Sequence, residues 1–482
     1  MMDDKQANVL ADSQGSISDG SNNNEVQSID WTEEEERKLV RRLDLVVMPP
    51  LVLALFALQL DRGNIGNALT DFFTFNVGIS LNQYNTGQLL LSLGIVILEI
   101  PSNLVLYKIG PTLWIGAQVI AWGLVATFQA FQKGLASFLV TRLLLGLCES
   151  GFIPAGLYTL SRWYKKDEIS KRFSIYFFGN NIAAALSGLL GYGILHMRGI
   201  CGLTGWQWLF LLEGMYTVIT GIVFLVVFPK SPDDPVSFMK IRFFSERESH
   251  ILKTRVHLDD PTKAQGRPHV SWSEFKRTFQ NWRLIPHFLT GLCGMAPSWT
   301  MGSYAPLLVA SFGYGRLTAN AYVSIGGWIL LVSNAAWGFL ADKFQRRGAM
   351  VFIGMLAYWC FTLGNKLSVY SDNETRRFAL LVVGVAFSSC WHPTNCSWVS
   401  LNARSPEERS ISMAIMIMSA NLAGIIGTQL FREDDAPKYP MGWTAILILV
   451  SLALVFTVLA NLQYFVLNRR LRNKEGARLY HP

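Results

Sequence analysis

The chain has 482 residues, of which 51% are hydrophobic and 16% are charged, and its mean hydropathy is +0.28. This composition is too apolar for a soluble chain of two or three domains, so we expect a protein that crosses a membrane many times and is not an enzyme. The net charge of +8 does not indicate a nucleic-acid partner, because Lys and Arg mostly flank apolar runs. The six cysteines and seven histidines form no metal-binding pattern, so no metal or other cofactor is expected.

Residues 1–30 are rich in Asp, Ser, Asn, Gln and Gly and contain no apolar segment behind a basic start. We expect a disordered cytoplasmic tail over residues 1–44 and not a cleaved signal peptide. Within it, Trp31–Val40 carries four consecutive glutamates ahead of basic residues and is predicted to be a short surface helix at most.

From Leu45 onward, apolar runs of about 17 to 25 residues, the length that crosses a bilayer, occur twelve times. A polar interval at 229–283 divides them into two groups of six. The expected fold is an all-α integral membrane protein with six-helix halves at 45–228 and 284–466, a linker between them, and a tail at 467–482. The predicted spans are 45–64, 84–107, 111–131, 135–158, 172–196, 206–228, 284–310, 321–341, 348–367, 377–400, 410–431 and 443–466.

Lys and Arg are concentrated in alternate loops, which predicts the orientation of the chain in the membrane. If the N-terminus is cytoplasmic, the basic loops and the linker all lie on the cytoplasmic side. We therefore expect both termini to be cytoplasmic. Because no organellar presequence is found, the plasma membrane is the expected location.

An aspartate and an arginine, Asp61 and Arg62, stand side by side at the end of the first apolar run. Charges inside a membrane are costly unless they face the protein interior or a water-filled cavity, so this pair marks a functional site. Arg62 offers a planar fork of donors that can hold a carboxylate bidentately, and it keeps its charge. The alternative is that Arg62 only neutralises Asp61 as a structural pair.

Four more charged residues lie inside apolar runs. Arg142 and Glu149 are seven residues apart, so both project from one face of the fourth span and can line one cavity. Packing near the membrane surface is the alternative for Arg142. Glu99 either satisfies backbone groups freed by Pro101 or lines an internal path. Glu213 is predicted to anchor to a basic residue in a structural role.

Several motifs resemble those of a known family. The loop Gly338–Arg347 reads GFLADKFQRR, which closely matches the loop signature of the major facilitator superfamily. Four further segments resemble the fungal allantoate and nicotinate permease branch of the anion:cation symporters. They are LDRGNIGNA at 60–68, EIPSN at 99–103, RLLLGLCESG at 142–151 and WQWLFLLEG at 206–214.

The resemblance extends over the whole chain and implies roles for single residues. Asp61 and Glu149 would carry protons, Arg62 would hold the substrate carboxylate, and Arg142 would respond to the state of Asp61. Amide and aromatic groups would orient the rest of the ligand by hydrogen bonding and stacking. The remaining candidates for substrate binding are Asn64, Asn67, Tyr304, His392, Asn395, Trp398 and Asn421.

His392 departs from the small residues that the family usually places around this proline. It narrows the pocket, adds a titrating group or packs as a satisfied histidine. For this reason the identity of the substrate stays open.

The resemblance implies a proton-coupled importer of a small organic anion, such as a vitamin acid or a ureido acid, that works by alternating access. Its expected partners are the anion, protons and the lipid bilayer, and a monomer is expected. An exporter of a self-made metabolite is the first alternative, because the same fold supports it. A membrane receptor is a weaker one, because the sequence contains no sizeable soluble domain.

Overall fold

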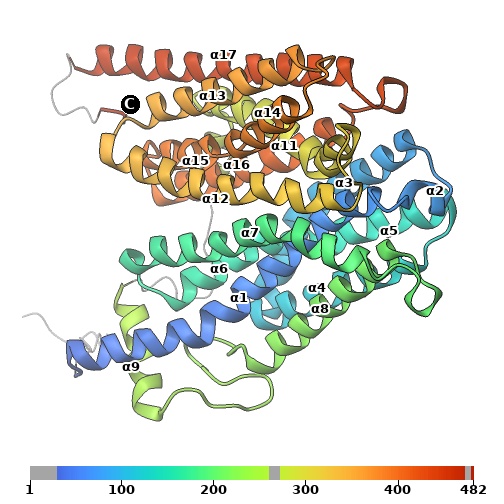
Figure 1. The fold of residues 1–482 in the computed structure, drawn as a ribbon. Coiled ribbons are helices and arrows are strands. Elements are labelled where there is room, and N and C mark those ends of the chain that lie inside the picture. The colour runs from blue at the N-terminus through green and yellow to red at the C-terminus, as the bar shows by residue number, and fades with distance from the viewer. Residues whose placement is uncertain (1–29, 260–271, 473–478, 482) are drawn as a thin grey trace, which may run out of the picture.

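The computed structural model describes residues 30–259, 272–472 and 479–481, and they form a bundle of long α-helices (Figure 1). Ten helical stretches of the described chain are long and apolar enough to cross a membrane. Residues 1–29 of the tail predicted over 1–44 lie outside the described residues.

The order of helices follows the predicted spans closely. The first group is α1 (Glu33–Leu69), α2 (Phe73–Val77), α3 (Leu81–Ile109), α4 (Pro111–Phe128), α5 (Gly134–Glu149), α6 (Phe152–Trp163), α7 (Lys166–Leu195) and α8 (Gly205–Val227). The linker contributes α9 (Glu246–Asp259) and α10 (Trp272–Phe279). The second group is α11 (Leu284–Ser311), α12 (Thr318–Phe344), α13 (Arg347–Leu367), α14 (Glu374–Phe387), α15 (Trp391–Leu401), α16 (Pro406–Gly427) and α17 (Pro440–Leu471).

Two further spans, which are less apolar or interrupted, complete the bundle. The helix α11 packs against α16 and α17, and the broken pair α14 and α15 packs against α12 and α13. With them, the described chain has twelve crossing segments, so the predicted all-α membrane fold is confirmed.

The first helix is longer than the sequence predicted. It begins at Glu33, behind a capping box that Thr32 forms with Glu35, and it continues unbroken into the first apolar run. The expectation of a separate short surface helix over Trp31–Val40 is therefore wrong. Glutamates in the first turn favour this extension, because negative charge is stabilised at a helix N-terminus.

Two crossing segments are broken near their middle. The helix α5 ends at Glu149, and Gly151, with φ of 75°, turns the chain into α6. Glycine suits this left-handed conformation because it has no Cβ. In the second half, residues 388–390 separate α14 from α15. Broken helices at membrane depth are tolerated where they are buried in protein or line a cavity, so both breaks indicate functional regions.

The two halves are joined at the end of the bundle that holds α2, opposite α9 (Figure 1). Arg316 donates from Nε to the Thr70 carbonyl oxygen at 3.0 Å, and Asn320 donates to Thr70 Oγ1 at 2.8 Å. At Gly66 the backbones meet so closely that a Cβ would lie 2.6 Å from the carbonyl oxygen of Gly302. The helix pairs in contact across the halves include α7 with α12, α3 with α16 and α1 with α11.

The linker helix α9 is held on the first half by ion pairs. Arg255 is buried and pairs with Glu36 and Glu168, while Arg42 bonds Glu248 at 2.9 Å. In contrast, α10 packs against α16 of the second half. The two ends of the linker therefore each follow their own half.

Candidate functional site

An ion pair joins α1 to α5 in the first half. Arg62 donates from Nε to Glu149 Oε2 at 2.9 Å. The Glu149 side chain is fully buried and that of Arg62 is 16% exposed. The counter-ion of Arg62 is thus Glu149 and not its neighbour Asp61, so the alternative of a structural Asp61–Arg62 pair does not describe this structure.

Arg62 also faces the second half. Its guanidinium carbon lies 5.8 Å from the centre of the Trp299 ring on α11. The ring is fixed because its Nε1 donates to the Ala420 carbonyl oxygen at 3.1 Å. Sequence reasoning missed Trp299, because its only signal is an aromatic residue in an apolar run. Arg62 therefore stands where the two halves meet.

Asp61 and Arg142 are both buried, but the described residues show no ion pair between them. Asp61 Oδ2 accepts a hydrogen bond from Thr217 Oγ1 on α8 at 3.1 Å, and its Oδ1 has no partner in the described chain. The Arg142 guanidinium lies over the Phe138 ring, and its Nε and Nη2 lack partners among the described atoms. Asp61 and Glu149 act on it electrostatically without touching it. The implied link between Arg142 and Asp61 is thus electrostatic in this state.

Glu213 does not anchor to a basic residue, so this prediction is wrong. Both of its carboxylate oxygens are buried and have no hydrogen-bond partner in the described part of the chain. Asn64, one of the candidate ligands, lies beside it, and its amide group is also buried without a partner there. The reason is that the polar neighbours of Glu213 are Asn64 and Asp61 on α1, neither of which is basic.

Two candidate ligands bond to neighbouring helices. Asn67 donates from Nδ2 to the carbonyl oxygen and to Oγ of Ser187, both at 3.1 Å, which joins α1 to α7. The hydroxyl of Tyr304 donates to Asn85 Oδ1 at 2.6 Å, across the two halves. Tyr304 therefore helps to close the α2 end in this state.

Asn421 also bridges the halves. Its Nδ2 donates to Glu99 Oε2 at 2.7 Å. The side chain of Glu99 thus bonds α16 and does not satisfy a backbone group freed by Pro101. Glu99 lies near enough to Arg62 for its charge to act on it. This contact brings Asn421 to the same region as the Arg62–Glu149 pair.

The candidates on α15 gather around a histidine that sequence reasoning missed. Asn395 Oδ1 lies 2.7 Å from Nδ1 of buried His287, and the Trp398 ring packs edge-on against the same imidazole. Trp398 Nε1 donates to the His481 carbonyl oxygen. The side chain of His392 stacks on Trp391. No contact of these residues with Arg62 occurs within the described ranges. A histidine inside an apolar run was the available signal for His287.

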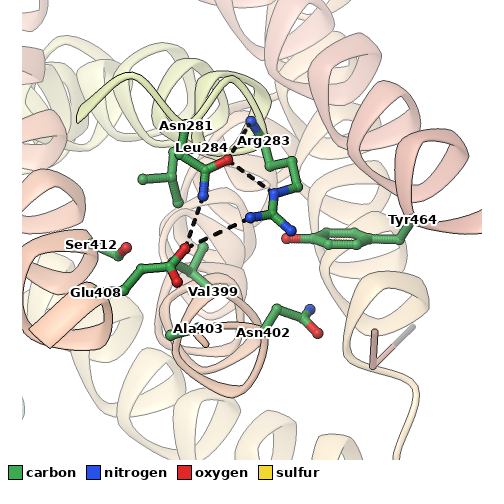
Figure 2. Close-up of a pocket in the computed structure, with 9 residues that line it drawn as sticks. All are labelled: Asn281, Arg283, Leu284, Val399, Asn402, Ala403, Glu408, Ser412 and Tyr464. Atoms are coloured by element: carbon green, nitrogen blue, oxygen red, sulfur yellow. Dashed lines mark hydrogen bonds and ion pairs between the residues drawn. The ribbon is translucent and has the colours of Figure 1, made fainter. Parts of the chain in front are cut away.

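Figure 2 shows a small pocket at the start of α11, between α15 and α16. Asn281 donates to Glu408 Oε1 at 2.9 Å and accepts from Arg283 Nε at 2.9 Å, so its polar groups mainly satisfy one another. Leu284 in its wall is fifteen residues before Trp299, about 22 Å along the helix. This pocket is therefore separate from the Arg62 region.

Two groups of crossing helices around buried charged residues define a membrane transporter. The chain belongs to the Major Facilitator Superfamily, whose family model matches residues 51–428.

Known relatives are transporters. An uncharacterized transporter of Saccharomyces cerevisiae is 30% identical over 418 residues, covering 86% of this chain and 77% of the relative. A provisionally named tartrate transporter of Agrobacterium vitis is 28% identical over 434 residues, covering 88% of this chain and 95% of the relative.

Solved structures share the fold. A bacterial homologue of the lysosomal transporter Spinster, inward-facing and unoccupied, has a TM-score of 0.66 and 15% identity over 90% of this chain and 99% of that one. The xylose transporter of E. coli, in a partially occluded inward-open conformation, also has a TM-score of 0.66, with 15% identity over 86% of this chain and 96% of that one.

Proposed function

We propose that the protein is a proton-coupled symporter that imports a small organic anion, and that it is a monomer of the allantoate and nicotinate permease type. The observation that carries this proposal is the buried Arg62–Glu149 ion pair at the meeting point of the two halves. Tartrate in the name of the Agrobacterium vitis relative supports a carboxylate as cargo.

The ion pair couples anion and proton by competition. While Glu149 is ionised, its carboxylate occupies Arg62, and an incoming carboxylate would have to displace it. A proton on Glu149 removes that competing charge and frees the guanidinium fork for bidentate binding of the substrate. Anion and proton therefore bind together and leave together.

Alternating access fits the way in which the halves meet. They are joined at the α2 end, where Tyr304, Arg316 and Asn320 bond the first half. With the termini and linker in the cytoplasm of a plasma-membrane protein, this joined end faces outside. Asn421 and Glu99 link the halves beside Arg62, so their bond must change when the halves rock.

The test is transport into liposomes that contain the purified protein, with an inward proton gradient. Labelled tartrate, nicotinate, pantothenate and allantoate serve as probes. Arg62→Lys keeps the charge but loses the bidentate fork, so the affinity for the transported probe should fall at least tenfold. Glu149→Gln mimics the protonated form permanently. It should still exchange labelled for unlabelled anion, but it should not accumulate anion against a gradient.

Two results would contradict the proposal. Wild-type affinity in the Arg62→Lys variant would show that the arginine does not hold the carboxylate. Concentrative uptake by Glu149→Gln with the pH dependence of the wild type would show that another group couples the proton.

A further inference from the structure

Two buried carboxyl groups on the packed helices α1 and α8 form no ion pair within the described residues. Asp61 on α1 is 1% exposed and Glu213 on α8 is 4% exposed. Both oxygens of Glu213 and Oδ1 of Asp61 have no hydrogen-bond partner within the described chain. The two groups are near enough to repel each other when both are charged. Asp61 has one hydroxyl donor, but neither carboxyl has an ion-pair partner in the described chain, and buried charges without one are costly, so this arrangement requires a physical explanation.

A threonine joins the two residues. Thr217 is one turn after Glu213 on α8, and its Oγ1 lies 2.9 Å from the Glu213 carbonyl oxygen and 3.1 Å from Asp61 Oδ2. Thr217 and Glu213 therefore lie on the same face of α8, and this face meets Asp61. Asn64, one turn after Asp61 on α1, lies beside Glu213. The two helices therefore bring two carboxyls, one amide and one hydroxyl together, and the Trp122 indole of α4 lies beside Asp61.

The charged groups around the pair are few. The helix α4, which packs against α8, contains no charged residue, and the charged residues of α7 lie only in its first two turns. The titratable and charged groups that face this region from the other helices are Arg62 on α1, Tyr84 and Glu99 on α3, and Arg142 and Glu149 on α5.

Charge balance assigns the protons. Four carboxyl groups face two guanidinium groups here, so two of the four must be neutral for the buried cluster to carry no net charge. The ion pair of Glu149 with Arg62 balances one carboxylate against one guanidinium. Arg142 balances one more charge. Glu99 has only an amide as its direct partner, so one of the two protons is assigned to Glu99. One proton is thus left for Asp61 and Glu213 together.

We propose that Asp61 and Glu213 form a single proton-binding site, a carboxyl pair that holds one proton between them, distinct from Glu149. Two nearby carboxylates in a buried region cannot readily ionise together, so the two groups take up one proton as a coupled pair. The pair gives Glu213 a role in proton binding. Asp61, which the family resemblance already implies as a proton carrier, thereby shares its proton with Glu213, and the charge that the pair presents to Arg142 changes with that proton.

This inference deepens the proton-coupling part of the proposed function, but its test needs protons alone. The purified full-length protein is examined by infrared difference spectroscopy as the pH is changed in H₂O and in D₂O, without any anion. The wild type should show a C=O stretching band of a protonated carboxyl that shifts in D₂O. Glu213→Gln and Asp61→Asn should each alter one component of this band, and the double variant should lose that component while keeping those of Glu149 and of exposed carboxyls.

Two further variants keep the result interpretable. Thr217→Val retains both carboxyls and a similar volume, and it should shift the same band because Asp61 loses its hydroxyl donor. Glu246→Gln changes an exposed glutamate on α9, so it should remove only the signal of a solvent-exposed carboxyl and leave the component of the buried pair unchanged.

The proposal is overturned if either single carboxyl variant leaves the band as in the wild type, since one carboxyl would then act alone. It is also overturned if Thr217→Val leaves the band unchanged, since the band would then not come from the carboxyl that Thr217 contacts. It is equally overturned if the double variant retains the component of the buried pair. Such a result would not touch the anion-binding role of Arg62, which the uptake experiment judges separately.

Discussion

Tyr304→Phe should loosen the closure at the α2 end of the bundle. The Tyr304 hydroxyl donates to Asn85 Oδ1 at 2.6 Å, and both residues are 1% exposed. Asn85 also donates from Nδ2 to the Phe431 carbonyl oxygen at 2.6 Å, so its amide is held in place from the second half. Phenylalanine keeps the ring packing but leaves the buried amide oxygen of Asn85 without its donor.

The size of the effect follows from the loss of one buried hydrogen bond. Leaving a buried acceptor unsatisfied costs about 1–3 kcal/mol. Because about 1.4 kcal/mol corresponds to a factor of ten, the equilibrium between joined and separated halves should shift about 5- to 150-fold toward separation. A shift of this size changes which side of the transporter is open most of the time.

The assay measures the reactivity of a cysteine placed between the halves. Ser303 is 6% exposed and accepts from Gln88 Nε2 at 3.2 Å across the halves, so Ser303→Cys places a thiol in the closed contact. Exposed Cys201 and Cys360 are first replaced by serine. The rate of labelling by a membrane-impermeant maleimide should then rise in Tyr304→Phe by the same 5- to 150-fold factor, because only the separated state exposes the thiol.

Tyr439→Phe is the matched control. Tyr439 is 2% exposed and its ring lies 5.7 Å from that of Tyr304, but its hydroxyl makes no hydrogen bond to the first half in the described chain. Its removal should leave the labelling rate unchanged. An unchanged rate in Tyr304→Phe, or an equal rise in the control, would refute the reasoning.

Two further outcomes are expected. His392→Ala should change which anions compete for uptake without abolishing transport if His392 reaches the binding region during the cycle, and an unchanged competition profile would assign it to packing. Burial opposes the charge of Glu248, but hydrogen bonds from Ser245 and Arg42 outweigh it and hold the pKa of Glu248 below its usual value of 4.5. Because the pKa of Glu248 is lower in the folded state, its carboxylate stabilises the protein fully above pH 4.5. This stabilisation is lost as the pH falls through the folded-state pKa. Glu248→Gln should therefore reduce the free energy of unfolding at pH 7 by about 1 kcal/mol or less, and this should lower the thermal unfolding temperature. At about pH 3 the two proteins should unfold at the same temperature.

The crossing segments could be predicted because a helix that crosses a bilayer needs a run of about 20 mostly apolar residues, which can be read directly from the sequence. Eleven of the twelve runs begin within about six residues of a helix start, since backbone groups in lipid must bond internally. The first helix differs, because its amphipathic start at Glu33 is stabilised outside the apolar run by capping and by contact with α9.

The charged residues of the candidate site could also be found from the sequence. Asp61, Arg62, Arg142 and Glu149 are conspicuous because charge is costly in a membrane. Their residue types suggested proton binding and carboxylate binding, and these roles stay predictions.

Only the tertiary structure decided which of these groups are partners. Arg62 and Glu149 are 87 positions apart, and their ion pair depends on the rotation of α1 relative to α5 about their axes. The same rotation turns Asp61 away from its neighbour toward Thr217 and Glu213 on α8, because successive residues in a helix point about 100° apart. Sequence spacing fixes the faces within one helix, whereas packing between helices determines which faces meet.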